Sequence, residues 1–239
     1  MTGRHGGVRP VHLGVLLPAG CGGGAGAPPD FAVCAALAGA AERARFDFVL
    51  LDGGGGGPEP VTVLHALAAL TERIGLAVAF PAGTGARAPY DLARRIAVLD
   101  RLSGGRAGGP PASSGEPAGP QGRPVAVDFG GSPEVLLTAR VPGVRRRGRR
   151  VRVLSRLDLA ALDLADASGA RELAERLHTQ VQSAATDGFV LTPDPAAGGA
   201  GLDAFAARVA PLLRERGSLR AAYTGTTLRE HLGLPRPVG

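Results

Sequence analysis

An aspartate at the end of an apolar segment is the first candidate for chemistry. Asp52 follows the mostly apolar residues 46–51 and precedes five consecutive glycines, Gly53 to Gly57. If residues 46–51 form a parallel strand, Asp52 lies at its carboxyl end, where ligands bind in parallel α/β folds. Its carboxylate can accept a hydrogen bond there, and glycines let a flat ring approach the backbone. A strand-end acid before a flexible glycine loop is an equally good interpretation.

A second candidate is an anion site formed by residues 130–133. Gly130, Gly131 and Ser132 follow an expected strand at 124–128 and begin a segment that can form a helix. Backbone N–H groups, the helix dipole and the Ser132 hydroxyl would together suit a phosphate. An ordinary helix N-cap is the alternative, and this segment alone favours it.

The basic residues do not predict a nucleic-acid partner. All 27 of them are arginines, which indicates a coding bias behind the formal net charge of +6. The densest run, residues 145–150, has no aromatic side chain between its arginines, so it offers no base stacking. A solvated loop is the better interpretation of that run.

The histidines and cysteines do not predict a metal site or an acid–base site. The five histidines have neither metal-ligand spacing nor a Ser–His–Asp order, so no catalytic residue is assigned from them: His5, His12, His65, His178 and His231. Two cysteines, Cys21 and Cys34, provide neither a disulfide framework nor a zinc site in a chain of this length.

Strands and helices alternate three times in the first hundred residues, which predicts an α/β fold with a parallel sheet. The expected strands are 11–17, 46–51 and 74–80, and the expected helices are 30–45, 58–71 and 89–102. Residues 106–123 are rich in glycine and proline and indicate a linker. After it we expect strands at 124–128, 151–154 and 188–191, and helices at 132–140, 157–165, 171–185 and 202–216.

The chain organisation is expected to be simple. Residues 1–10 are predicted to be disordered and residues 11–237 to form one domain. The apolar run at 11–17 is too short to span a bilayer, and residues 1–10 lack a signal-peptide core. We therefore expect a cytoplasmic protein without a membrane partner.

Several segments in collinear order resemble the bacterial-luciferase-like flavin monooxygenases. The most specific are Pro89–Arg95 with Leu99–Gly108, and the tail from Asp187 through Tyr223 to Pro237. The tail and Pro120–Pro124 are similar to the branch that contains nitrilotriacetate monooxygenase, the pristinamycin synthase subunit and dibenzothiophene-sulfone monooxygenase.

The resemblance implies a TIM barrel that binds reduced FMN. A separate NAD(P)H:flavin reductase would supply that FMN, which would react with O₂ to oxygenate a small organic substrate. Asp52 matches the flavin-contacting acid after the second strand, and Ser132, beside Gly131, matches the serine that holds the FMN phosphate. The family also has a hydroxyl side chain at the third strand. Counting along the sequence places Ala82 at that position, and Thr84 is the expected substitute.

The middle of the chain departs from the family pattern. Pro110 and Pro111 stand where a fourth strand is expected, residues 135–144 make a poor sixth strand, and a long central region is absent. We therefore predict an incomplete TIM-barrel-like (β/α) fold with about six of eight strands. Its open edges would favour a homo-oligomer. The alternative function is a non-catalytic luciferase-like paralogue that acts as a binding or interaction protein.

Overall fold

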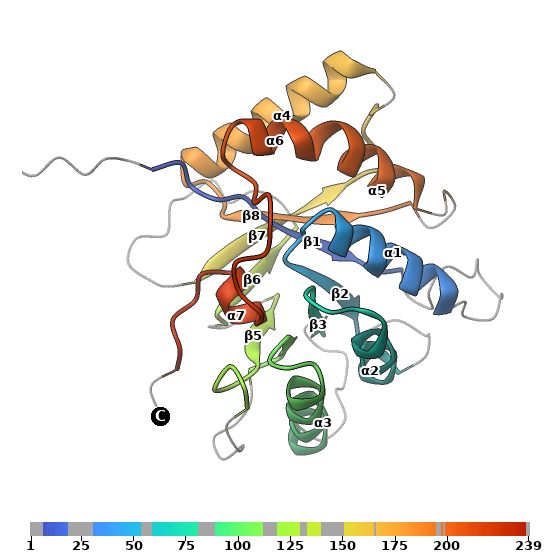
Figure 1. The fold of residues 1–239 in the computed structure, drawn as a ribbon, viewed down its shortest axis with the longest axis vertical. Coiled ribbons are helices and arrows are strands. Elements are labelled where there is room, and N and C mark those ends of the chain that lie inside the picture. The colour runs from blue at the N-terminus through green and yellow to red at the C-terminus, as the bar shows by residue number, and fades with distance from the viewer. Residues whose placement is uncertain are drawn as a thin grey trace, which may run out of the picture.

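Eight parallel strands close into a barrel in the computed structural model of the chain (Figure 1). The structure describes residues 7–18, 31–53, 59–80, 89–111, 119–129, 133–139, 151–164, 166–194, 197 and 199–237. The strands are β1 (His12–Leu16), β2 (Phe48–Asp52), β3 (Gly75–Ala79), β4 (Ala107–Gly109), β5 (Val125–Asp128), β6 (Val135–Thr138), β7 (Arg152–Asp158) and β8 (Gly188–Thr192). The barrel closes where β1 pairs with β8, with His12 opposite Gly188.

Helices surround part of this barrel. They are α1 (Phe31–Arg43), α2 (Pro60–Leu70), α3 (Pro89–Leu102), α4 (Ala167–Gln182), α5 (Ala200–Ala204), α6 (Ala210–Glu215) and α7 (Leu228–His231), with a π-helical turn, η2 (Phe205–Val209), between α5 and α6. Local sequence explains two of the helix starts. The Glu59 side chain accepts a hydrogen bond from the Thr62 backbone N–H at 2.8 Å, and Asp166 accepts one from the Ser168 backbone N–H at 3.2 Å.

Two apolar clusters hold the layers together. Because successive strand residues face opposite sides, each strand can contribute to both clusters. In β2, Leu50 is buried inside the barrel, while Val49 and Leu51 pack between the barrel and the helices. The absence of tryptophan leaves this packing mainly to alanine, valine and leucine, as the composition predicts.

The barrel prediction is confirmed, but the expectation of about six strands was wrong. The missing fourth strand is β4, only three residues long, and it ends directly before Pro110. Its glycines are required by packing: a Cβ on Gly109 would lie 2.5 Å from the Ile96 side chain. The prolines therefore follow a strand whose glycines look like loop residues in the sequence.

The sixth strand is also present, and two predicted helices were wrong. Residues 135–138 form β6 where a helix at 132–140 was expected. The helix expected at 157–165 is absent because β7 continues to Asp158, where the Asp158 carboxylate accepts a hydrogen bond from the Ala160 N–H at 3.0 Å in the turn that follows.

An offset between strands explains how the short middle still closes a barrel. Val127 and Asp128 at the end of β5 pair with Val135 and Leu136 at the start of β6. The chain therefore returns only to the second residue of β5 before β6 begins, where the Glu134 N–H donates a hydrogen bond to the Ala126 carbonyl at 3.0 Å. Parallel strands in register need a crossover of a dozen or more residues, whereas residues 129–134 suffice here.

This arrangement omits part of the usual helical layer. Between β4 and β7 the described residues contain no helix, whereas a standard TIM barrel has one after each strand. Among all described residues, no helix has the length and apolar character needed to cross a bilayer.

The C-terminal tail closes the amino end of the barrel. Leu228, Leu232 and Leu234 join the apolar cluster inside the barrel. A capping box between Thr227 and Glu230 fixes the start of α7. A Cβ on Gly75, the first residue of β3, would lie 2.5 Å from Leu228, so this close seating of the tail depends on a glycine.

Candidate functional site

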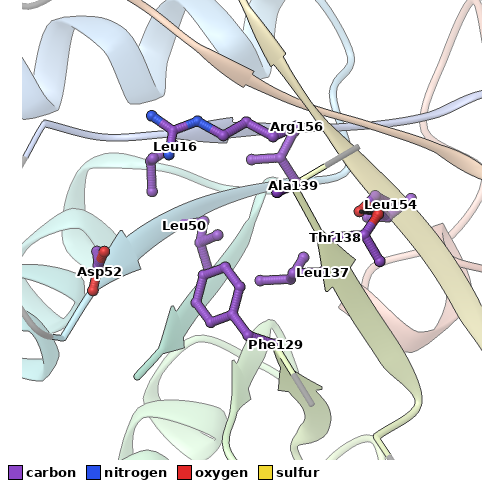
Figure 2. A pocket seen from close by; sticks show the side chains of 10 residues that line it. Leu16, Leu50, Asp52, Phe129, Leu137, Thr138, Ala139, Leu154 and Arg156 are labelled. Atoms are coloured by element: carbon purple, nitrogen blue, oxygen red, sulfur yellow. Dashed lines mark hydrogen bonds between the residues drawn. The ribbon is translucent and has the colours of Figure 1, made fainter. Parts of the chain in front are cut away.

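A cavity of about 340 Å³ lies at the carboxyl ends of the strands. This is the end of a parallel β/α barrel where ligands bind. Its walls come from β1, β2, β6, β7 and β8 and from the residues that directly follow β5 and β6, most of them labelled in Figure 2: Leu16, Leu50, Asp52, Phe129, Leu137, Thr138, Ala139, Leu154, Arg156 and Val190.

The cavity is apolar except at its rim. Leucine and valine side chains cover its floor, and the Phe129 ring, 42% exposed, stands at the edge. Three lining residues have polar side chains: Asp52, Thr138 and Arg156. A pocket with an apolar body and a few polar groups suits a small organic ligand or an aromatic cofactor.

Asp52 lies on the cavity wall at the end of β2, as its place in the sequence predicts. The chain then passes close to the neighbouring strand, because the Gly53 N–H donates a hydrogen bond to the Ala79 carbonyl at 2.8 Å. A Cβ on Gly53 would overlap the Phe80 ring, so the residue after Asp52 has no room for a side chain in this packing.

The other predicted cofactor residues lie outside the described residues. Thr84, Gly131 and Ser132 belong to this group, and the phosphate site therefore stays a prediction. Phe129 and Pro133, on either side of residues 130–132, are described, and Phe129 lines the cavity.

Arg156, Thr138 and Phe129 are cavity residues that the sequence analysis missed. Arg156 lies on β7 beyond Leu154, and its Nε donates a hydrogen bond to Thr192 Oγ1 at 3.1 Å. Leu154 and Arg156 are two residues apart and therefore lie on the same face of the strand. A predicted strand that continued past residue 154 would have placed Arg156 at the rim. Thr138 was assigned to a helix, which hid its place at the end of β6.

A buried ionisable network lies at the opposite end of the barrel. Asp47 is fully buried, and its Oδ1 lies 3.1 Å from His12 Nδ1 and also accepts a hydrogen bond from Arg220. Burial alone would raise the pKa of Asp47, but His12 and Arg220 together hold it below the usual value. His231 and Tyr223 stack beside this group with ring centroids 4.8 Å apart.

This network is part of the tail attachment rather than of the cavity. Arg220 also donates a hydrogen bond to the His231 carbonyl at 2.7 Å, which ties the tail to the Asp47 carboxylate. None of the described histidines lines the cavity. Among the described residues, no group of three or more His, Cys, Asp and Glu side chains could hold a metal ion.

The model of the family of luciferase-like monooxygenases matches residues 11–109. Over residues 11–109 the chain is similar to the luciferase-like monooxygenases. N-acetyl-S-(2-succino)cysteine monooxygenase from Bacillus subtilis (strain 168) is 43% identical over 67 residues, 28% of this chain and 15% of that relative. A pristinamycin IIA synthase protein from Streptomyces pristinaespiralis is 47% identical over 75 residues, 29% of this chain and 26% of that relative.

A third luciferase-like relative is dibenzothiophene-sulfone monooxygenase from Rhodococcus erythropolis, 39% identical over 66 residues. That match spans 28% of this chain and 14% of the relative. The matched segments thus span only small parts of these curated relatives, although two of the three belong to the branch that the sequence analysis named.

Solved structures share the barrel over almost the whole chain. EDTA monooxygenase (EmoA) from Chelativorans sp. BNC1 superposes with a TM-score of 0.72 at 19% identity, covering 95% of this chain and 99% of that one. Riboflavin lyase (RcaE), solved with modified FMN and riboflavin, has a TM-score of 0.69 at 17% identity, covering 95% and 97%. At this identity the likeness shows a common fold.

Proposed function

We propose that this protein is a flavin-dependent monooxygenase that uses reduced FMN and O₂ to oxygenate a small organic substrate. A separate NAD(P)H:flavin reductase would supply the reduced FMN. The observation that carries the proposal is the apolar cavity with Asp52 on its wall, at the carboxyl ends of the strands in a relative of the luciferase-like monooxygenases.

The residues of the cavity fit a flavin. Leu16, Leu50 and Val190 offer apolar surface to a flat ring, and the Asp52 carboxylate can accept a hydrogen bond from a ring N–H. Ser132 and Gly131 are the proposed phosphate contacts, and Thr84 the proposed third-strand contact. Bound flavin would supply the redox chemistry with O₂, which the side chains of the protein cannot perform.

The contribution of the protein is then to bind, orient and exclude water. Apolar walls keep water from the reacting ring, and the rim groups Asp52 and Arg156 are placed to hold polar ends of the ligands. Such a site needs no histidine base, and no described histidine lines this cavity.

The short middle of the chain favours one second candidate, a non-catalytic paralogue that binds a ligand or another protein. The strands from β4 to β7 follow one another without a described helix. A barrel reduced in this way can keep a ligand cavity while losing the segments that complete a catalytic site.

An anaerobic titration with reduced FMN tests the flavin proposal. We expect saturable binding to the full chain, and Asp52→Ala should weaken it about tenfold because a charged hydrogen-bond acceptor is lost. Ser132→Ala should also weaken it. Asp203→Ala is the matched control, since Asp203 is exposed on α5 and does not line the cavity.

The outcomes separate the two candidates. No binding at high micromolar reduced FMN would exclude the monooxygenase. Binding followed by O₂ consumption without any oxygenated product, across a panel of small organic acids, sulfur compounds and amines, would favour the non-catalytic paralogue. Unchanged affinity in Asp52→Ala would show that the flavin lies elsewhere.

A further inference from the structure

An arginine stands at the rim of the apolar cavity. In β7, Leu154 belongs to the cluster inside the barrel, and Arg156 follows it by two residues on the same face. Arg156 is exposed, but it stands on the inner face of a barrel strand at the cavity rim. Arg156 and Asp52 lie on different sides of the cavity (Figure 2).

The neighbouring strand orients the Arg156 guanidinium. Arg156 pairs in register with Val190 of β8, and its Nε donates to Thr192 Oγ1 two residues further along that strand. This bond uses Nε, and no described residue is hydrogen-bonded to either terminal nitrogen, so both can bind a ligand. A guanidinium held in this way can donate two parallel hydrogen bonds to a carboxylate or phosphate.

Arg156 has no counter-ion among the described residues. Within the described ranges, carboxylates form ion pairs with other arginines, among them Arg9, Arg95, Arg152, Arg216, Arg220 and Arg229. The nearest acid along β7, Asp158, instead accepts a hydrogen bond from the Ala160 N–H. The positive charge at the cavity rim is therefore placed to meet an anionic group of a ligand.

We propose that Arg156, oriented by Thr192, is the subsite for an oxyanion group of a ligand whose apolar part fills the cavity. The group is a carboxylate or a phosphate, and it belongs either to the substrate or to FMN. This assignment rests on the proposed function in taking the cavity as the ligand site. It narrows the substrate class to acids if the group is a carboxylate.

Two matched ligand pairs distinguish the sources. FMN and riboflavin share a ring system and differ by the phosphate, and hexanoate and hexanol share an apolar chain and differ by the carboxylate. The affinity of each ligand is measured for the full chain and for Arg156→Ala, Arg156→Lys and Arg176→Ala. Arg176 is an exposed residue of α4 and is the matched control.

We expect the unsubstituted chain to bind the anion of at least one pair about tenfold more tightly than its neutral partner, as one charged hydrogen-bonded contact predicts. Arg156→Ala should abolish that preference, Arg156→Lys should keep part of it, and Arg176→Ala should keep all of it. If Arg156→Ala loses the preference for FMN over riboflavin, the subsite binds the phosphate. If it loses the preference for hexanoate over hexanol, the subsite binds a carboxylate.

The proposal is overturned if neither pair shows a preference for the anion, or if the preference persists in Arg156→Ala. Its failure differs from failure of the proposed function. If neither flavin binds but hexanoate shows an Arg156-dependent preference, the subsite stands and the flavin proposal falls. If both flavins bind equally well and hexanoate binds no better than hexanol, the flavin proposal stands and the subsite falls.

Discussion

Asp52 and Arg156 show how single residues at strand ends give an apolar cavity its chemistry. Each lies two positions past a leucine buried in the barrel, Leu50 for the acid and Leu154 for the arginine. The acid can accept a hydrogen bond and the arginine can donate two. The cavity is therefore suited to a molecule with unlike polar ends.

Gly53 is a further residue on which the rim depends. Gly53→Ala would place a Cβ on the Phe80 ring, which must then move. Because Phe80 is only partly buried, we expect a loss of about 1 kcal/mol in the free energy of unfolding. Urea unfolding measures this loss. Gly7→Ala, where a Cβ would meet nothing within 4 Å, is the control, and equal effects would contradict the packing argument.

Sequence reasoning reached the site only in part, for reasons of local geometry. Asp52 was found because an apolar strand, an acid and a glycine run occur in order. Arg156 was missed because the apolar residues from Leu157 to Leu164 were interpreted as a helix. The strand β7 in fact continues to Asp158. A strand that long is stabilised by pairing along Leu154–Asp158 with β8, and such long-range contacts leave no local signal.

At the scale of elements, β1, β2, β3, β5 and β8 were predicted close to their observed bounds, whereas β4 and β6 were missed and only the start of β7 was predicted. β4 consists of Ala107, Gly108 and Gly109, whose small size fits the space left by Ile96 and Leu228. Three-residue strands rich in glycine cannot be told from loops by periodicity. The barrel as a whole was expected from the resemblance to the luciferase-like flavin monooxygenases, because three regular βα units alone predict only a parallel α/β sheet.

The tail element carries a pH-dependent part of the stability. Burial and then the charge of Arg220 lower the pKa of His231, so the folded chain keeps this histidine neutral where the unfolded chain protonates it. The unfolded state then binds more protons below about pH 6.5, and stability must fall as the pH falls there, by at most ~1.4 kcal/mol per pH unit.

Replacing His231 tests this contribution. We expect the unfolding free energy of His231→Gln to vary less steeply between about pH 7.5 and pH 5 than that of the unsubstituted chain, even if the variant is less stable throughout. Denaturant titrations at several pH values measure both slopes. Asp47 affects stability in a lower pH range. Because the pKa of its carboxyl group is lowered in the folded chain, the stabilisation by its charge is lost only near and below about pH 4. Parallel slopes would contradict the assignment to His231.

At the scale of the molecule, the barrel depends on closing β1 against β8. Gly188 lies at this seam, and a Cβ there would overlap the His12 carbonyl oxygen. Backbone cannot move aside as a side chain can. We therefore expect Gly188→Ala to cost about 3 kcal/mol of unfolding free energy, more than Gly53→Ala. Calorimetric or urea unfolding of both variants measures which loses more unfolding free energy. A smaller loss for Gly188→Ala than for Gly53→Ala would contradict tight backbone packing between β1 and β8.

The same seam determines when the protein can finish folding. β1 leaves the ribosome early, but its neighbour β8 and the tail that fills the barrel floor are synthesised much later. Until then one edge of β1 is open to pairing with other nascent chains. Contacts this distant in sequence also form slowly. The yield of soluble protein should therefore rise when synthesis is slowed or chaperones are abundant. The edge of β1 is exposed only during synthesis, because β1 pairs with β8 in the finished barrel.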